Sequence, residues 1–303
     1  MTPSRRFEVT VNNRKVSEKM NSIFENQVAV VTGAGGVLCS EISLYLAGQG
    51  AKVALVGRTE EKLRKVEARI LENGGTCMVR TLDVTKEADV EALAEEVKNV
   101  WGSCRYLING AGGNNNKAVT TNFTFEKEEL LPEEERKEEM TGFFDLDLDI
   151  FEGVIRTNTL GTVIPVRAFA KQMAKEGRGS ILNFASMNST RPLTRVPAYA
   201  MSKAAVVNLT QFLATYFAPA GIRVNAVAPG FFVNERSRKI LCTPEGGLTK
   251  RGQNVIDHTP MQRFGEPKEL LGCVSFLLDD EKASFVTGIT VPVDGGFLAH
   301  SGV

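Results

Sequence analysis

The chain has 303 residues and a mass of 33.0 kDa, above the ~100–150 residues of a common single domain but within reach of one large α/β domain. Its 36 basic and 36 acidic residues give a net charge of zero, so no basic surface predicts nucleic acid or an anionic membrane as a partner. No uncharged apolar run approaches the ~20 residues of a membrane helix, and we expect a soluble protein. Five cysteines without CxxC spacing favour the cytoplasm, and two histidines make a metal site unexpected.

Residues 1–23 show no helical or strand period, so we expect a loosely attached amino-terminal arm, followed by a single catalytic domain over 24–303. The arm has no apolar segment, which argues against a secretory signal. From Gln27 onward, β-branched runs alternate with amphipathic stretches, as is typical of βαβ units. Strands are expected over 27–32, 52–56, 77–82, 105–109, 180–185, 222–228 and 290–294. The pattern predicts a single-domain α/β Rossmann fold, with a doubly wound seven-stranded parallel sheet and helices on both faces.

The first strand runs directly into a glycine-rich turn, and a helical pattern begins near Leu38. Glycines let the backbone approach a pyrophosphate, whose charge is stabilised at the amino end of the helix. The residues expected to contact a dinucleotide are Gly33, Gly35, Gly36, Val37 and Leu38. A purely structural turn is the alternative, which the strand-turn-helix context makes weaker.

The second strand ends in Gly57, Arg58 and Thr59, where the common fingerprint has an acid that binds the ribose 2′-hydroxyl of NAD. A glycine and a guanidinium leave room and positive charge for a 2′-phosphate, so NADP(H) is favoured and NAD(H) remains possible. The alternative is that Arg58 is only a solvated residue at the start of a helix and does not contact the cofactor. Asp83 and Val84 follow the third strand and are expected at the adenine end, unless Asp83 caps the next helix.

Two long segments interrupt the alternation. The insertion over about 114–149 carries eleven acidic and four basic residues, and a solvated helix or lid surface is favoured over a binding role for its charges. The segment over about 231–260 lies between a strand end and the last helix. Because long loops at the carboxyl ends of parallel strands usually close over ligands, we expect it to be the substrate lid.

Ser186 follows a buried strand, and Tyr199 and Lys203 are spaced four residues apart, on one face of a helix. A phenol with a pKa near ~10 is a poor base at neutral pH, but a nearby ammonium is expected to lower that pKa. A Tyr-x-x-x-Lys spacing alone also arises by chance. The preceding serine and the nucleotide-binding turn favour a catalytic role.

At this point the sequence resembles the short-chain dehydrogenase/reductase family from Gln27 to the carboxyl end. The resemblance rests on TGAGGVLC at 32–39, NGAG at 109–112, Asn158 in NTLG, Ser186, Tyr199, Lys203, Ala228-Pro229-Gly230 and VDGG at 293–296. It implies an NAD(P)-dependent oxidoreductase acting on a CH–OH group, without a metal, that assembles as a homotetramer. It also implies cofactor contacts from Asn109, Ala111, Gly112, Tyr199, Lys203, Pro229 and Gly230.

The resemblance further implies that Tyr199 is the general acid in carbonyl reduction and the base in the reverse direction. Ser186 would hydrogen-bond the same oxygen, Lys203 would hold the nicotinamide ribose, and Asn158 would support a water relay. The chain departs from the family pattern at two places. The pattern TGxxxGxG has glycines where this chain has Val37 and Cys39, and Gly110 replaces a frequent asparagine.

Within the family, several strings resemble the bacterial D-mannonate oxidoreductase (fructuronate reductase) group and imply a sugar-acid substrate: GGNNN at 112–116, FFDLD at 143–147, SMNSTRPLT at 186–194, PGFF at 229–232 and HTPMQRFGEP at 258–267. The candidate substrate residues are Asn114, Asn188, Arg191 and His258, with Arg191 as the carboxylate ligand. Arg156, Arg195 and Arg263 are competitors for that role. The alternatives are a reductase of a gluconate-type acid or a carrier-bound 3-oxoacyl group, and a nucleotide-binding sensor without turnover.

Overall fold

The structure is a computed structural model that describes residues 22–233 and 235–301. Most of the expected amino-terminal arm therefore lies outside the described residues. Ile23, the last residue of the expected arm, is part of the folded domain. It packs against the core, and its carbonyl accepts a hydrogen bond of 3.4 Å from the Tyr106 hydroxyl. The folded domain thus begins slightly before residue 24. No helix within the described ranges is both long and apolar enough to cross a bilayer.

All seven predicted strands form, and they make one parallel sheet in the order β3-β2-β1-β4-β5-β6-β7. The strands are β1 Val28–Thr32, β2 Lys52–Gly57, β3 Thr76–Thr81, β4 Tyr106–Asn109, β5 Gly179–Phe184, β6 Ile222–Pro229 and β7 Thr290–Val293. The doubly wound architecture is confirmed. Central strands such as β1 are buried along their whole length, because helices cover both faces of the sheet.

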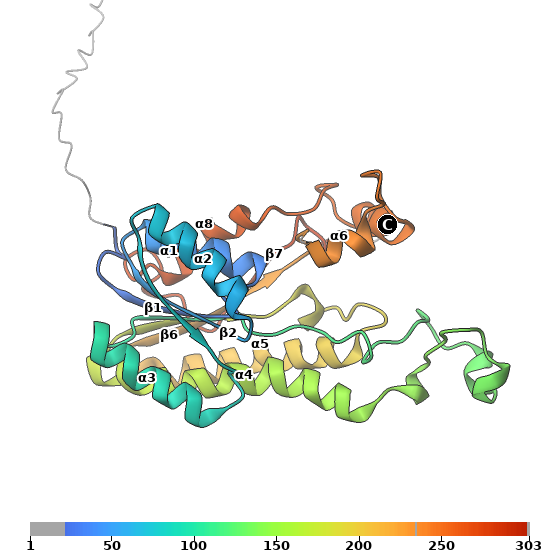
Figure 1. The fold of residues 1–303 in the computed structure, drawn as a ribbon, viewed down its shortest axis with the longest axis horizontal. Coiled ribbons are helices and arrows are strands. Elements are labelled where there is room, and N and C mark those ends of the chain that lie inside the picture. Colours follow the sequence, from blue (N-terminus) through green and yellow to red (C-terminus); the bar gives the residue numbers. More distant parts are fainter. Residues whose placement is uncertain (1–21, 234, 302–303) are drawn as a thin grey trace, which may run out of the picture.

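The helices are α1 Val37–Gly48, α2 Glu60–Glu72, α3 Glu87–Trp101, α4 Leu148–Glu176, α5 Pro197–Phe217, α6 Glu235–Leu241, α7 Lys250–Asp257 and α8 Leu271–Leu278. Figure 1 shows α1, α2 and α8 on one face of the sheet and α3, α4 and α5 on the other. Alternate strand residues divide between the two layers. In β1, Ala29 and Val31 pack under α1 and α8, whereas Val28 and Val30 pack under α3, α4 and α5.

The strand order reverses between β1 and β4, which places the chain's topological switch point between them. In doubly wound sheets, ligands bind in the crevice outside the carboxyl ends of the strands at this point. The glycine-rich turn after β1 and the turn after β4 both leave the sheet there. The fold therefore brings the two segments with the strongest nucleotide-binding signals side by side.

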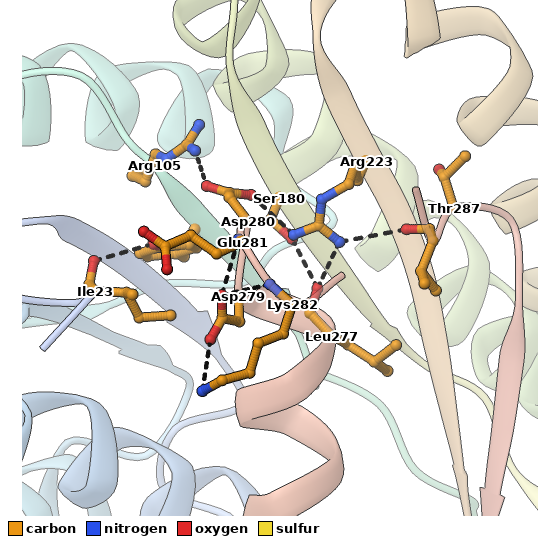
Figure 2. A network of polar contacts seen from close by, with 12 residues as sticks. Ile23, Arg105, Ser180, Arg223, Leu277, Asp279, Asp280, Glu281, Lys282 and Thr287 are labelled. Carbon is orange, nitrogen blue, oxygen red and sulfur yellow. Dashed lines mark hydrogen bonds and ion pairs between the residues drawn. The ribbon is translucent and has the colours of Figure 1, made fainter. Parts of the chain in front are cut away.

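A polar network at the opposite, amino-terminal edge of the sheet ties β4, β6 and α8 together (Figure 2). Asp280 follows α8 and forms ion pairs with both Arg105 and Arg223, the second at 2.9 Å. The buried Arg223 also donates to the Leu277 carbonyl at 2.8 Å. The last helix is thus anchored to the central strands on the side away from the crevice.

Of the two alternatives expected for the acidic insertion, a solvated helix or a lid surface, the long helix does not form. Residues 114–147 contain only short 3₁₀ helices, over Lys127–Leu130, Glu133–Glu135 and Phe143–Asp145. Pro132 and the dense run of like charges oppose a longer helix. Nor are all its charges solvated: Glu129 is buried, and its carboxylate accepts hydrogen bonds from the backbone N–H groups of Glu126 and Phe143, each at 3.2 Å.

Candidate active site

Two adjoining cavities of about 260 and 320 Å³ lie at the carboxyl edge of the sheet. Gly110 and Gly112 line both, so the cavities form one continuous cleft. Of the expected cofactor residues, the smaller cavity is lined by Gly33, Gly35, Gly36, Arg58, Asp83, Val84, Ala111 and Gly112. The larger one is lined by Val37, Leu38, Ser186, Asn188, Tyr199, Lys203, Pro229 and Gly230. The cleft therefore gathers residues that follow β1 to β6.

The glycine-rich turn has the shape that a pyrophosphate requires. Gly33 has φ +68°, and a Cβ there would lie 2.6 Å from the Gly110 carbonyl oxygen. Helix α1 begins directly after Gly36, which provides no side-chain cap for the first N–H groups of the helix. These uncapped donors and the positive end of the helix dipole favour an anion at this position. The residues fit the diphosphate of a dinucleotide.

The far end of the smaller cavity carries two basic side chains, Arg58 and Lys62. Sequence reasoning missed Lys62, which lies in the first turn of α2, four residues after Arg58. Asp83 lines the cavity, and its carboxylate accepts from the Thr85 N–H at 2.9 Å and hydroxyl at 2.8 Å. It does not cap the next helix, because the N-cap of α3 is Lys86.

Ser186, Tyr199 and Lys203 meet in the larger cavity. Pro197 occupies the first turn of α5, so Tyr199 and Lys203 follow in successive turns. The Lys203 Nζ lies 5.8 Å from the centre of the Tyr199 ring and donates to the Phe184 carbonyl at 2.6 Å. Ser186 comes from the end of β5, and its hydroxyl accepts from the Asn188 N–H at 3.2 Å. A serine, a phenol and an amine thus converge on one pocket.

Burial determines the protonation of Tyr199 and Lys203. Burial raises the pKa of the Tyr199 phenol above its usual value, while a hydrogen bond to Ser186 acts in the opposite direction. The Tyr199 pKa is therefore raised, and not lowered as its spacing from Lys203 predicted. Burial lowers the pKa of Lys203 to about 8. At neutral pH, Tyr199 holds its proton and can donate it.

Asn158 is buried on α4 and fixes the turn that follows β4. Its Nδ2 donates to the Gly113 carbonyl at 2.8 Å, and its Oδ1 accepts from the Gly113 N–H at 3.0 Å. A Cβ on Gly112 would overlap Oδ1 of Asn158, so glycine is required there. Asn109, expected to contact the cofactor, instead lies buried beneath the cleft and donates to the Asn183 side chain at 2.9 Å.

The two departures from the family pattern compensate each other. A Cβ on Gly110 would overlap the Sγ of Cys39 and lie 3.0 Å from the Thr32 carbonyl oxygen. The thiol therefore fills the space that a side chain at position 110 would need. Burial raises the pKa of Cys39 to about 12, so it remains a neutral packing group beside Lys203.

We predict that Gly110→Ala destabilises the protein by about 1–3 kcal/mol, because the added methyl group overpacks the contact with Cys39. Combining it with Cys39→Ala, which removes the sulfur, should recover most of this loss in free energy of unfolding. Urea unfolding of both single variants and the double variant measures the coupling. Gly48→Ala serves as control, since a Cβ there meets nothing within 4 Å. Strictly additive effects of the two changes would contradict the interpretation.

The structure separates the predicted substrate residues into two groups. Asn188 lines the cleft, and Asn114 directly follows the turn that Asn158 fixes. Arg191 is exposed and donates to the His300 carbonyl at 2.8 Å, so it holds the carboxyl-terminal segment. His258 is exposed at the end of α7, with Nδ1 2.7 Å from the Asn254 carbonyl oxygen. Neither Arg191 nor His258 lines the two cavities.

Comparison with known proteins agrees with this geometry. The profile of the short chain dehydrogenase family matches residues 27–242. An uncharacterized oxidoreductase of Haemophilus influenzae is 42% identical over 93% of this chain and 97% of its own length. A solved structure from that genus, provisionally named D-mannonate oxidoreductase and holding NAD, is 42% identical with a TM-score of 0.86, covering 92% of this chain and 97% of the other. The gluconate 5-dehydrogenase of Burkholderia cenocepacia, solved with NADP and tartrate, is 26% identical with a TM-score of 0.77, covering 92% and 98%.

Proposed function

Because this chain belongs to the short-chain dehydrogenase family and is an oxidoreductase that uses a nicotinamide cofactor, we propose that it interconverts D-fructuronate and D-mannonate. The convergence of Ser186, Tyr199 and Lys203 in the cleft that begins at the glycine-rich turn carries the proposal. The sugar-acid strings of the sequence and the similarity to the Haemophilus structure support this substrate.

The bound nicotinamide supplies or accepts the hydride. In the reducing direction, Tyr199 donates its hydroxyl proton to the carbonyl oxygen of the substrate, and its raised pKa keeps that proton in place at neutral pH. Ser186 hydrogen-bonds the same oxygen and orients the carbonyl. Lys203 faces the Tyr199 ring from the next helical turn and stabilises the phenolate that remains. Asn158 holds the turn at Gly113 in place beside them.

The direct test is incubation of the purified protein with D-fructuronate and either NADPH or NADH. We expect a loss of reduced-nicotinamide absorbance that depends on the sugar acid. No loss with either cofactor would refute the proposal. A gluconate-type keto acid is the second candidate, which the similarity to gluconate 5-dehydrogenase favours, and 5-ketogluconate belongs in the same assay.

We propose that NADP(H) is the preferred cofactor, with NAD(H) accepted. Arg58 and Lys62 line the end of the cavity where the adenosine ribose would lie, and both can pair with a 2′-phosphate. Because the Haemophilus structure holds NAD, the measurement that tests this preference is the ratio of the activities with NADPH and with NADH.

We predict that Arg58→Asp lowers the preference for NADP(H) over NAD(H) by about 10²-fold, as expected for losing a ~3 kcal/mol charged contact. The carboxylate would repel a 2′-phosphate and accept from a 2′-hydroxyl. The measurement is kcat/KM for both cofactors at saturating substrate. Arg64→Asp, six residues later in the chain, on α2 and outside the cavity, is the control. An unchanged ratio in Arg58→Asp would show that Arg58 does not contact the cofactor.

We further propose a cytoplasmic homotetramer with residues 231–260 as the substrate lid. All five cysteines are free, as suits a reducing compartment. Two aromatic side chains on α5, Phe212 and Tyr216, are stacked with ring centres 5.7 Å apart and are 60% and 66% exposed. Such a patch suits burial against another subunit. Light scattering should give four times the chain mass of 33.0 kDa.

A further inference from the structure

The acidic insertion over 114–149 buries a charged side chain and exposes its aromatic ones. In its interior, the buried Glu129 carboxylate also accepts from the Asn122 side chain at 3.3 Å. At its base, Thr121 and Thr141 are joined by two hydrogen bonds of 2.9 Å. Polar contacts therefore fix the insertion, and all four of its phenylalanines are left on the outside.

The apolar surface that the insertion exposes is large. Phe125, Phe143 and Phe144 form one cluster, in which the centre of the Phe144 ring lies 6.4 Å from each of the other two. At roughly 200 Å² for a whole large side chain, six exposed side chains of the insertion present on the order of 700 Å², close to the ~800 Å² that each partner buries in a stable complex. The six, which are 57% to 75% exposed, are Phe123, Phe125, Leu130, Phe143, Phe144 and Leu148.

The same insertion is strongly negative. Its eleven acidic and four basic residues leave a surplus of seven negative charges, whereas the whole chain is neutral. Several of its acids are exposed and form no ion pair with any side chain that the structure describes. They are Glu133, Glu134, Glu135, Glu138 and Glu139. A surface that covers the insertion must therefore combine apolar side chains with positive charge.

A surface with both properties lies at the carboxyl ends of α4 and α5, which pack side by side. It combines two stacked, exposed aromatic rings of α5 with two exposed lysines, one turn apart on α4, that have no ion pair within the described ranges. The neighbouring acid, Glu176, accepts from the Ser103 hydroxyl at 2.9 Å. The helix-end patch, as we call this surface, consists of Lys171, Lys175, Phe212 and Tyr216.

The insertion and the helix-end patch cannot meet within one chain. The insertion leads into the amino end of α4, whereas the patch lies at the carboxyl end, and a helix of 29 residues is about 43 Å long. Figure 1 shows the insertion standing out beyond the amino end of α4, away from the rest of the molecule. If two copies are related by a two-fold axis that crosses α4, their α4 helices run antiparallel. Each insertion then reaches the helix-end patch of the other copy, and the contact is made twice.

We propose that the acidic insertion is an arm exchanged between two copies of this chain. Its phenylalanines pack against Phe212 and Tyr216 of the partner subunit, and its exposed glutamates lie beside the partner subunit's Lys171 and Lys175. Burial of the aromatic side chains supplies the affinity, while the opposite charges orient the two copies. The proposal goes beyond a homotetramer, because it names the two surfaces that form one of its interfaces.

A charge swap tests whether the two surfaces contact each other. We expect Lys171→Glu with Lys175→Glu to raise the dissociation constant about tenfold or more, because like charges then face each other. Glu134→Lys with Glu135→Lys should have the same effect. All four changes together should return the dissociation constant to within about threefold of the original, since opposite charges face each other again. Sedimentation equilibrium measures it, and a protein with all four changes that dissociates as readily as either pair alone would overturn the proposal.

The apolar part of the contact is tested by Phe143→Ser with Phe144→Ser. Light scattering should give half the mass of the original protein, because one interface is lost, while circular dichroism stays unchanged, because both rings are exposed. Leu71→Ser, at a leucine of α2 that is 56% exposed, is the control and should leave the mass unchanged. An unchanged mass in the phenylalanine variant, or an original protein that is monomeric, would overturn the proposal.

A fluorescent probe on the insertion reports the contact directly. Phe144→Trp is combined with Trp101→Phe, which removes the one tryptophan of the chain. In the assembled protein the emission from position 144 should lie at shorter wavelength, because the second copy excludes water from the ring. Adding Lys171→Glu with Lys175→Glu, at the other end of α4, should move it to longer wavelength. Emission that does not respond to the lysine changes would overturn the proposal, and since no substrate is used, failure of the proposed function leaves this result unaffected.

Discussion

Replacement of Tyr199 by phenylalanine should abolish most turnover, lowering kcat about 10²–10⁴-fold, while the protein still folds and binds its cofactor. The change removes one oxygen atom from the larger cavity and leaves the ring that Lys203 faces. The loss falls on kcat because the proton is needed at the carbonyl oxygen during hydride transfer. Ser186 can still hydrogen-bond that oxygen. Unlike Tyr199, however, Ser186 has no lysine one helical turn away.

The control for this variant is Tyr216→Phe, the same chemical change at an exposed position of the same helix. Cofactor affinity, followed by the fluorescence of bound NADPH, should change less than threefold in either variant, within the ~0.6 kcal/mol scatter of a conservative change. Turnover by Tyr199→Phe at the original rate would refute the role of Tyr199 as the proton donor.

Lys203→Met should give an inactive protein that is more stable than the original by about 2 kcal/mol at pH 7. Lys203 is 5% exposed, and burial lowers its pKa from 10.5 to about 8. At about 1.4 kcal/mol per pKa unit, carrying a proton in the folded state costs roughly 3 kcal/mol. Loss of the hydrogen bond to the Phe184 carbonyl offsets about 1 kcal/mol of the gain. Such a trade between stability and activity is common at functional sites.

The pH dependence of this stability difference has a defined sign. Between pH 8 and 10.5 the unfolded chain holds a proton on Lys203 that the folded chain has released, so stability rises with pH across this window. The cost of holding the Lys203 proton in the folded protein is complete below pH 8 and absent above pH 10.5. The advantage of Lys203→Met in urea unfolding should therefore shrink as pH increases from 8 to 10. A stability advantage of Lys203→Met that stays constant with pH would contradict the conclusion that burial lowers the Lys203 pKa. So would a Lys203→Met protein that is less stable than the original at pH 7.

The catalytic group shows why local patterns predicted so much of the site. Tyr199 and Lys203 are four residues apart, and helix geometry alone places them in successive turns. The glycine-rich turn follows β1 directly, so its position at the switch point follows from the strand order that βαβ units impose. Both signals are short in sequence and depend on regular elements. Hydrophobic runs of β-branched residues located all seven strands for the same reason.

Contacts between segments far apart in the chain could not be predicted from the sequence. Arg191 follows the catalytic serine closely, yet its side chain turns to the His300 carbonyl. The buried Glu129 likewise looked like one acid among many in a charged run.

The sequence by itself determined the family, the doubly wound sheet, the glycine-rich turn and the spacing of Tyr199 and Lys203, because each depends on hydrophobic period or on residues a few positions apart. Only the tertiary structure decided that Asn109 lies buried against Asn183 and how Cys39 fills the space above Gly110. Those properties depend on the distance and the water exclusion between side chains far apart in the chain. Packing creates both, and no local pattern encodes them.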